Sequence, residues 1–383
     1  MRCLQILTIT LLFGPLLFGQ STEPLLITHG PWLQNLSEHG VTVCFTTNLP
    51  AVPGVMLGFG DSGADSLIRN STDGLIHTGV NTHQVRLTGL KPGTGYVYRI
   101  HAVELLKHRP YQVYYGDTIK GKEFRFSTRE PQAEVINYLI INDIHTNGAK
   151  LASFLKSGKA ADQDLVIYNG DIVDNFETVD QLLGPIMDTS VRYFASEVPF
   201  VFVRGNHETR GILSRRLRDY LDFPDGRYYY AFDQGPVHVV VLDCGEDKPD
   251  TNRYYYGLAD FDRYRLQQLE WLKVHLQSDE YRRADFRLII IHMPIMPGER
   301  AGYGPKFLFE HFGPVLREAG ADLMVSAHTH RIQWLDASSS GLGFPVLING
   351  SNSFITLEAN RKTLSFQVVT DKEEVTLSKQ ISR

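Results

Sequence analysis

The sequence predicts an all-β sandwich followed by an α/β region with a largely parallel sheet. From Ile27 to Arg129, short runs alternate apolar and polar residues between turns rich in Gly, Pro, Asp and Asn, which is typical of antiparallel strands. From Val135 onwards, continuous apolar runs alternate with stretches of helical periodicity, which is typical of strands buried on both faces. The polar, proline-containing REPQAE (129–134) separates the two patterns. We therefore expect one domain over residues 22–129 and a second over residues 134–383.

The start of the chain has the layout of a secretory signal peptide. One charge, Arg2, precedes an apolar segment from Leu4 to Phe18, and small and polar residues follow at 19–22. The apolar segment is shorter than the roughly 20 residues of a membrane span. We predict a signal peptide over residues 1–20 and an exported protein, located in the periplasm, outside the cell or at its surface. An uncleaved anchor is the alternative.

The composition excludes several classes of function. A net charge of −5 over 383 residues argues against a broad nucleic-acid-binding surface. No segment after the predicted signal is apolar enough to span a membrane. Only Cys44 and Cys244 remain in the mature chain, so we expect no disulfide framework, and a metal site has to use nitrogen and oxygen ligands. The sequence does not specify the oligomeric state.

In the first region we expect strands at VTVCF, HQVRL, YVYRIHAV and EFRFST. The stretch LTGLKPGTGYVYRI (87–100) resembles the fibronectin type III pattern, in which Leu-x-Pro-x-Thr-x-Tyr leads into a strand. We therefore expect a fibronectin III-like sandwich of roughly 100 residues. The histidines of this region are scattered, and we interpret all of them as structural or solvent-facing: His29, His39, His77, His83, His101 and His108.

In the second region we expect helices near 148–158, 177–195, 209–221 and 306–319, and another around RYRLQQLEWLKVHL. A hairpin is expected at YYYAFDQGPVHVVVLD, and short strands return in the final segment. His238, His275 and His311 lie inside these strand and helix patterns, and we interpret them as structural.

Five apolar runs of the second region end in residues that suit a metal ion. They lead into Asp143-Ile144-His145, Gly170-Asp171 with Asp174, Gly205-Asn206-His207-Glu208, His292, and His328-Thr329-His330. Ligands in open α/β sheets bind beyond the carboxyl ends of the strands, so we expect these side chains to meet at one edge. In extended backbone, side chains two residues apart lie on the same side, so His328 and His330 are expected to project together.

In combination, the blocks D-x-H, G-D-x-x-D, G-N-H-E, an isolated His and x-H-x-H resemble the calcineurin-like metallophosphoesterase superfamily. The resemblance runs from about Val135 to the C-terminus. It implies a four-layer fold, in which helices flank a sandwich of two sheets, and two divalent or trivalent transition-metal ions (Mn, Fe, Zn or Co). Carried over position by position, one ion would be held by Asp143, His145, Asp171 and His330, and the other by Asp171, Asn206, His292 and His328.

The ligand types agree with phosphoester chemistry. Two cations about 3.5–4 Å apart can share a hydroxide and hold two phosphoryl oxygens. Neutral imidazoles favour Mn, Fe, Co or Zn over Mg or Ca. We expect His207 to face the substrate, where it would stabilise developing charge or protonate the leaving oxygen. The resemblance implies that Asp174 orients His207; a charge at a helix N-terminus is the alternative role of Asp174.

A β-sandwich followed by this catalytic domain is similar to the architecture of purple acid phosphatases, but two positions depart from their pattern. Those enzymes have D-x-G in the first block and G-D-x-x-Y in the second, and the tyrosinate ligates iron and gives the colour. Here His145 and Asp174 occupy the two positions. We expect His145 to replace the tyrosinate as a ligand, and therefore no ferric–tyrosinate absorption band.

The sequence thus predicts an exported, dinuclear metal-dependent phosphoesterase, acting on a small phosphate ester by in-line attack of a metal-bound hydroxide. Acid phosphatase-like monoester hydrolysis is the leading hypothesis. One alternative is a phosphodiesterase acting on nucleotide or lipid-type diesters, and another is a surface binding or adhesion module with an inactive phosphoesterase domain. Candidates for the substrate cleft are Tyr228–Tyr230, Tyr254–Tyr256, Arg300 and Tyr303, although such aromatic residues more often pack.

Overall fold

The computed structural model describes residues 23–60, 62–298 and 302–383. The predicted signal peptide (1–20) and Arg300 lie outside the described residues. None of the helices formed by the described residues has the length and apolar character needed to cross a membrane.

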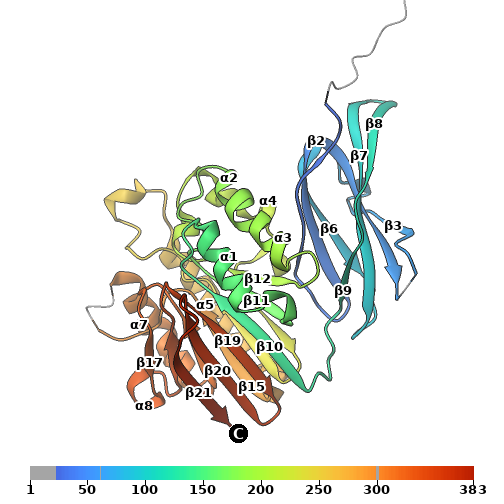
Figure 1. Cartoon of the computed structure of the whole chain (residues 1–383). Coiled ribbons are helices and arrows are strands. Elements are labelled where there is room, and N and C mark those ends of the chain that lie inside the picture. Colours follow the sequence, from blue (N-terminus) through green and yellow to red (C-terminus); the bar gives the residue numbers. More distant parts are fainter. Residues whose placement is uncertain (1–22, 61, 299–301) are drawn as a thin grey trace, which may run out of the picture.

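The first region consists of strands only (Figure 1). They are β1 (Ile27–Gln34), β2 (Gly40–Phe59), β3 (Ser66–Ile68), β4 (Ser71–Thr72), β5 (Leu75–Ile76), β6 (Val80–Thr88), β7 (Gly95–Arg109), β8 (Gln112–Lys120) and β9 (Phe124–Ser127). The pairing is antiparallel, with β2 between β1, β6 and β7. Val41, Val43 and Phe45 alternate along β2 and are fully buried in the core of this region, as their period of two predicts.

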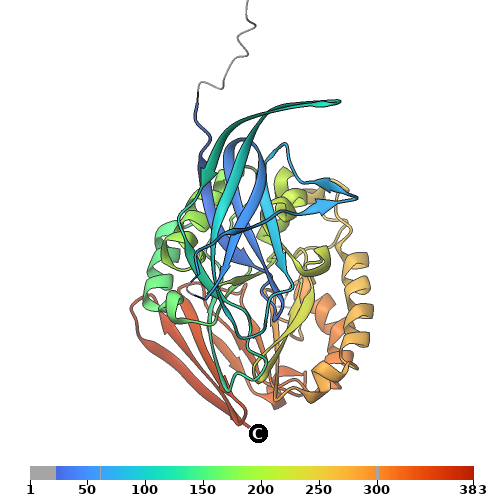
Figure 2. The same cartoon turned by 90° about the vertical axis from the view of Figure 1, so that its right-hand side faces the viewer.

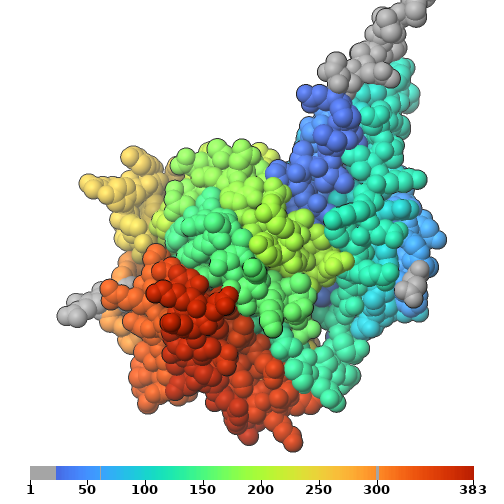
Figure 3. Space-filling model, viewed as in Figure 1, coloured from blue at the N-terminus to red at the C-terminus, as the bar shows by residue number. Residues whose placement is uncertain are grey.

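The other face of β2 is covered by the second region. Trp32 on β1 and Cys44 on β2 are fully buried in the hydrophobic core of the second region rather than in that of the first. The strand β1 also pairs in parallel with β12 at Gln34 and Phe200, so that one sheet of 13 strands runs through both regions. Figure 3 shows the two regions in close contact. The domain boundary predicted at 129–134 falls in the connection between β9 and β10, and independent folding of the two parts stays a prediction.

The second region begins with strands and helices in alternation. Their order is β10 (Val135–Ile141), α1 (Gly148–Ser157), η1 (Ala160–Asp162), β11 (Leu165–Asn169), α2 (Asp180–Leu182), η2 (Leu183–Asp188), α3 (Thr189–Tyr193), β12 (Phe200–Val203), η3 (His207–Thr209), η4 (Ile212–Arg216), α4 (Leu217–Tyr220), η5 (Pro224–Gly226), β13 (Tyr230–Gln234), β14 (Val237–Leu242) and η6 (Arg253–Tyr255). The C-terminal part adds α5 (Phe261–His275), α6 (Asp279–Arg283), β15 (Phe286–Ile291), α7 (Tyr303–Arg317), β16 (Leu323–Ser326), β17 (Gln333–Leu335), α8 (Ala337–Ser340), β18 (Val346–Ile348), β19 (Ser353–Asn360), β20 (Thr363–Thr370) and β21 (Val375–Ser382).

These strands form two sheets that pack on each other between helices, which is the predicted four-layer arrangement. One sheet has the order β21-β20-β19-β10-β11-β12 and the other β13-β14-β15-β16-β18-β17. Val239 and Val241 of β14 face the core between the sheets, whereas Val240 and Leu242 pack under α5 and α7. The strand is therefore apolar on both faces, which explains its continuous run. In Figure 2 the green helices and the tan and orange helices lie on opposite sides of the sheets.

The helix expected near 177–195 forms over residues 180–193, where α2, a π-helical turn over Leu183–Asp188 and α3 follow one another without a gap. One other expected helix is much shorter than predicted. The segment near 209–221 forms only a 3₁₀ turn (η4) and a single α-turn (α4). Gly211 adopts φ = 91°, so a helix cannot continue through this position.

Candidate metal centre

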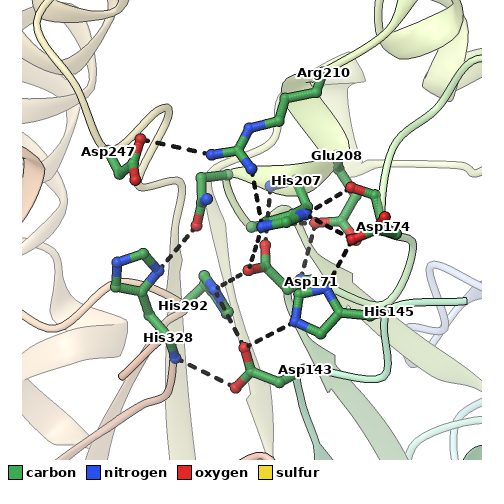
Figure 4. Close-up of polar contacts among 12 residues, drawn as sticks. Asp143, His145, Asp171, Asp174, His207, Glu208, Arg210, Asp247, His292 and His328 are labelled. Carbon is green, nitrogen blue, oxygen red and sulfur yellow. Dashed lines mark hydrogen bonds and ion pairs between the residues drawn. The ribbon is translucent and has the colours of Figure 1, made fainter. Parts of the chain in front are cut away.

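The predicted site residues meet at one edge of the two sheets, at the carboxyl ends of β10, β11, β12, β15 and β16 (Figure 4). Asp143 and Asp171 follow the first two of these strands by two residues, and His292 directly follows β15. The side chains of these three residues are buried. The structure therefore brings the five blocks with candidate ligands together at one edge.

The backbone at the site is unusual. Left-handed φ angles occur at Asp143 (51°), His145 (51°), Asp171 (52°), His328 (70°) and His330 (60°). The extended backbone expected for His328 and His330 is therefore wrong. The left-handed conformation turns the chain sharply after each strand, so that the two imidazoles reach different partners. It costs of order 1–3 kcal/mol per non-glycine residue and persists where the surrounding contacts require it, commonly at functional sites.

Asp143, His145 and His330 form a first cluster. The Oδ1 atom of Asp143 lies 3.3 Å from Nε2 of His330 and 3.8 Å from Nε2 of His145. One ligand atom from each of the three residues lies within 4.8 Å of the others, a spacing at which they can hold one ion.

Asp171, His292 and His328 form a second cluster of the same kind. Nε2 of His292 lies 3.0 Å from Oδ2 of Asp171, and Nδ1 of His292 donates a hydrogen bond to the Asn169 carbonyl (2.8 Å). That bond fixes the tautomer and leaves Nε2 as the ligand atom. Nδ1 of His328 lies 3.0 Å from Oδ1 of the buried Asn206.

Asp171 belongs to two groups of possible ligands, because a third group combines it with His145 and His207. Its carboxylate therefore lies between the first and second clusters, as a bridging ligand would. Some ligand atoms have no hydrogen-bond partner among the described residues although they are buried: Asp143 Oδ1, both ring nitrogens of His145, and His292 Nε2. Unpartnered buried polar atoms are rare, and two cations would provide the missing partners.

The charges of the site agree with ionised carboxylates. Burial raises the pKa of Asp171, but the positive charge of His292 and the hydrogen bond from the backbone N–H of His207 outweigh it, so this pKa lies well below its usual value. Burial lowers the pKa of His328 to about 4, and the charge of His292 acts in the same direction. Burial also opposes a charge on His292, yet Asp171 and Asp143 raise its pKa to about 10. A proton on His292 therefore occupies the position facing Asp171 that a cation would take.

His207 and Asp174 are adjacent, as the proposed dyad requires. Nδ1 of His207 donates to the backbone carbonyl of Asp174 (2.6 Å) and lies 3.3 Å from its carboxylate. The same carboxylate lies 3.4 Å from Nδ1 of His145. With Nδ1 protonated, Nε2 of His207 faces Asp171 at 3.8 Å. Asp174 therefore contacts both imidazoles, and its closest contact with His207 comes from the backbone.

The role of Glu208 was not recognised from the sequence, although it lies in the G-N-H-E block. Its buried carboxylate accepts hydrogen bonds from four backbone N–H groups, those of Asp171, Ile172, Val173 and Gly205 (2.7–3.0 Å). These four bonds use the acceptor capacity of the carboxylate. Glu208 therefore holds the loop that carries Asp171 against the loop that carries Asn206.

Arg210 is a second residue of the site whose role the sequence does not indicate. Its guanidinium forms two bonds to the buried Glu246 (Nε 2.7 Å, Nη2 3.2 Å), and Nη1 donates to Nε2 of His207 (2.9 Å). Nη2 also lies 3.6 Å from Asp247 (Figure 4). The only sequence signal is an arginine four residues after Asn206. Glu246 lies 36 residues further on, in a loop without a motif, so the pair is visible only in the structure.

The aromatic candidates for the substrate cleft separate into two groups. Tyr228, Tyr254 and Tyr255 line a cavity to which Arg210 and Glu246 also contribute. The hydroxyl of Tyr303 is bonded instead to Asp262.

Residues 136–331 match the family model of calcineurin-like phosphoesterases. The chain belongs to this family. Human acid phosphatase type 7 is 24% identical over 254 residues, which are 64% of this chain and 53% of the relative. Purple acid phosphatase 21 of Arabidopsis thaliana is 23% identical over 266 residues, 65% of this chain and 52% of the relative. The chain thus spans about half the length of these curated relatives.

Two solved structures have the same fold as this calcineurin-like phosphoesterase. Purple acid phosphatase PPD1 from yellow lupin (Lupinus luteus) seeds superimposes with a TM-score of 0.67 at 15% identity, over 92% of this chain and 74% of that chain. The structure of PhoD has a TM-score of 0.61 at 12% identity, over 92% of this chain and 88% of that chain. Both matches confirm the predicted α/β fold class with large sheets.

Proposed function

We propose that the protein is an exported phosphoric ester hydrolase that requires two metal ions and acts on small phosphate monoesters. The observation that supports this most strongly is the pair of ligand clusters around Asp171, with buried ligand atoms that lack hydrogen-bond partners. The names of the curated relatives, acid phosphatase type 7 and purple acid phosphatase 21, support the monoester preference. The family itself is hydrolytic.

The donor set suits two transition-metal ions. Asp143, His145, Asp171 and His330 would hold one ion, and Asp171, Asn206, His292 and His328 the other. When bound, such ions supply charge neutralisation for the phosphoryl oxygens and lower the pKa of a water molecule that attacks phosphorus. Nitrogen and oxygen ligands of this mixture favour Mn, Fe, Zn or Co.

Arg210 and His207 would bind the phosphoryl group. Glu246 fixes the guanidinium of Arg210 by two bonds, and the remaining nitrogen, Nη1, reaches the space in front of Asp171. A phosphoryl oxygen can take the place of His207 Nε2 as the acceptor for Nη1, because an anion is a stronger acceptor than a neutral imidazole. Once released from Arg210, Nε2 of His207 can receive a proton and donate it to the leaving oxygen.

A substrate panel tests this function. Protein loaded separately with Mn, Zn, Fe and Co is assayed with nitrophenyl phosphate and with bis(nitrophenyl) phosphate. We expect hydrolysis of the monoester at the higher kcat/KM, together with two bound metal equivalents by elemental analysis. A higher kcat/KM for the diester would establish the phosphodiesterase alternative. Bound metal without hydrolysis of either ester would favour the binding-module alternative.

The colour of the iron-loaded protein tests the ligand exchange at His145 and Asp174. Because Asp174 occupies the position of the tyrosinate in purple acid phosphatases, we expect no ferric–tyrosinate band in the visible spectrum of the iron-loaded protein. Asp174→Tyr is the matched variant, and a new visible band in this variant alone would support the assignment. A charge-transfer band in the wild-type protein would contradict it.

Export and the division into residues 22–129 and 134–383 are part of the same proposal. N-terminal sequencing of the mature protein is expected to begin near residue 20, where we predict that the signal ends. A mature protein that retains Met1 would contradict cleavage.

A further inference from the structure

A cavity of about 860 Å³ opens next to the candidate metal centre. It lies between the segment that follows His207 and the loop from Glu246 to Phe261, which forms the yellow lobe at the left of Figures 1 and 3. Arg210 lines this cavity and also contacts His207, so the cavity and the phosphoryl-binding space share one wall. A volume of this size is typical of small-molecule sites.

The floor of the cavity is a rigid stack of charged and aromatic groups. Arg204 is paired with the buried Asp243 and lies over one ring, that of Tyr228, at 3.9 Å from its centroid. Arg218 lies over the same ring at 4.4 Å. Two cation–π contacts and a buried ion pair hold Tyr228 in a single orientation. The cavity therefore has a preformed floor.

The rim of the cavity is apolar. Ile212, Tyr254 and Leu258 line it and are respectively 72%, 62% and 75% exposed, which makes them some of the most exposed large hydrophobic residues that the structure describes. They come from the two segments on opposite sides of the cavity. Exposed apolar groups gathered at the mouth of a concave site indicate contact with an apolar or aromatic ligand group.

Positive charge in the cavity is only partly compensated. Arg204 is neutralised by Asp243, Arg210 by Glu246, and Lys248 by Asp247. Arg215 and Arg218 also line the cavity, and neither forms an ion pair with a carboxylate within residues 23–60, 62–298 and 302–383. Of the acidic residues on the wall, Glu246 is bonded to Arg210 and Asp260 to Arg263. Because Arg218 packs on the ring of Tyr228, Arg215 is the guanidinium group that is available for an anion.

We propose that this cavity, the leaving-group pocket, binds the leaving group of a phosphate ester that contains an aromatic ring and a second negatively charged group. The inference rests on the proposed function, which places the phosphoryl group in front of Asp171 and Arg210. The ring contacts Ile212 and Tyr254, and the second anion pairs with Arg215. Aliphatic phosphate esters whose leaving group carries no negative charge lack both interactions.

The pocket is tested with full-length, metal-loaded enzyme and three esters: ethyl phosphate, naphthyl phosphate and a sulfonated naphthyl phosphate. In Arg215→Ala the preference for the sulfonated over the plain naphthyl ester, as a ratio of kcat/KM, is expected to fall by about fivefold, as an exposed ion pair allows. Arg216→Ala is the matched control, because Arg216 pairs with Asp219 and does not line the cavity. An equal change in both variants would overturn the proposal.

The ring contact has its own matched pair. In Tyr254→Ala the ratio of kcat/KM for naphthyl over ethyl phosphate is expected to fall by about three- to tenfold, the usual strength of an aromatic contact. Tyr256→Ala removes a tyrosine that is 87% exposed and does not line the cavity, and is expected to leave this ratio unchanged. Thermal melting of all four variants reports that each is folded. An unchanged ratio in Tyr254→Ala would overturn the aromatic part of the proposal.

A binding measurement separates the pocket from the proposed activity. Failure of every metal to support hydrolysis of any ester would refute the proposed function alone. Calorimetry with the non-hydrolysable sulfonated naphthyl phosphonate then decides on the pocket. Weaker binding to Arg215→Ala than to Arg216→Ala, by about fivefold, supports the leaving-group pocket. Equal affinities for the two variants would refute it.

Discussion

The two regions of the molecule use the same side chain, histidine, in opposite ways. In the first region His83 lies within β6, buried beside the ring of Phe45, and its Nε2 is 2.8 Å from the Thr47 hydroxyl. In the second region His292 and His328 lie just beyond strand ends, where their nitrogens face Asp171 and Asn206. His83 is enclosed by a packed layer and remains neutral, whereas His292 and His328, beyond the strand ends, reach side chains from other loops. Position relative to the strand end therefore separates the structural histidines from the candidate ligands.

The largest effect is expected at Asp171, which belongs to two of the three groups of possible ligands. Asp171→Ala removes the oxygen atoms that both groups of ligands share, and we expect kcat/KM to fall by at least about 10³-fold, with fewer than two bound metal equivalents. Asp73→Ala changes an exposed carboxylate of the first region and serves as the control. Full activity of Asp171→Ala with two metal equivalents would remove the basis of the comparison.

The next effect concerns the contact between the regions. Trp32→Ala creates a cavity where β1 packs into the core of the second region, and we expect the free energy of unfolding to fall by about 3–5 kcal/mol. Denaturant titration followed by circular dichroism measures the change. Leu26→Ala, at a residue that is 53% exposed, is the control and is expected to change the free energy by less than about 0.5 kcal/mol. Loss of the first region alone, in a separate transition, would show that the two regions are less coupled than the shared sheet suggests.

A third test separates His207 from the ligand histidines. His207→Ala is expected to lower kcat by about 10²–10³-fold while two metal equivalents remain bound, because we assign its imidazole to the substrate. Asp174→Asn is expected to lower kcat by about tenfold, since the backbone carbonyl of Asp174 still holds His207. Elemental analysis alongside steady-state kinetics measures both. Loss of a metal equivalent in His207→Ala would assign this imidazole as a ligand, together with His145 and Asp171.

The smallest effect is expected from a histidine of the first region. Burial lowers the pKa of His83 from 6.5 to about 4, so the unfolded chain binds a proton more readily than the folded protein between these values. Its contribution to stability is therefore complete above pH 6.5 and falls by about 1–3 kcal/mol as the pH drops to 4. Urea titrations of wild type and His83→Gln at pH 7 and pH 4 measure the difference. An equal loss of stability in both proteins would show that His83 is not the responsible group.

Much of the second region follows from local pattern. VINYLII predicts a strand whose observed bounds are Val135–Ile141, and the D-x-H and G-N-H-E blocks follow their strands as expected. The failures have a common cause. The left-handed backbone at His328 and the short helix after Gly211 both occur where the chain is bonded to a distant segment: the N–H of His328 donates to Asp143, and that of Leu213 to the Phe176 carbonyl. Propensity and periodicity cannot report such contacts.

By itself, the sequence determined which segments become strands and helices and which polar residues follow the strands, because periodicity records the burial of each face. Tertiary structure alone decided how those residues are used. The ring nitrogen that each histidine presents, the bonds from Glu208 to two loops, and the pairing of Arg210 with Glu246 arise when distant segments pack together. The same holds for the continuous sheet through β1 and β12, whose register joins Gln34 to Phe200. Contacts over such separations depend on chain closure and packing, which leave no periodic signal in the sequence.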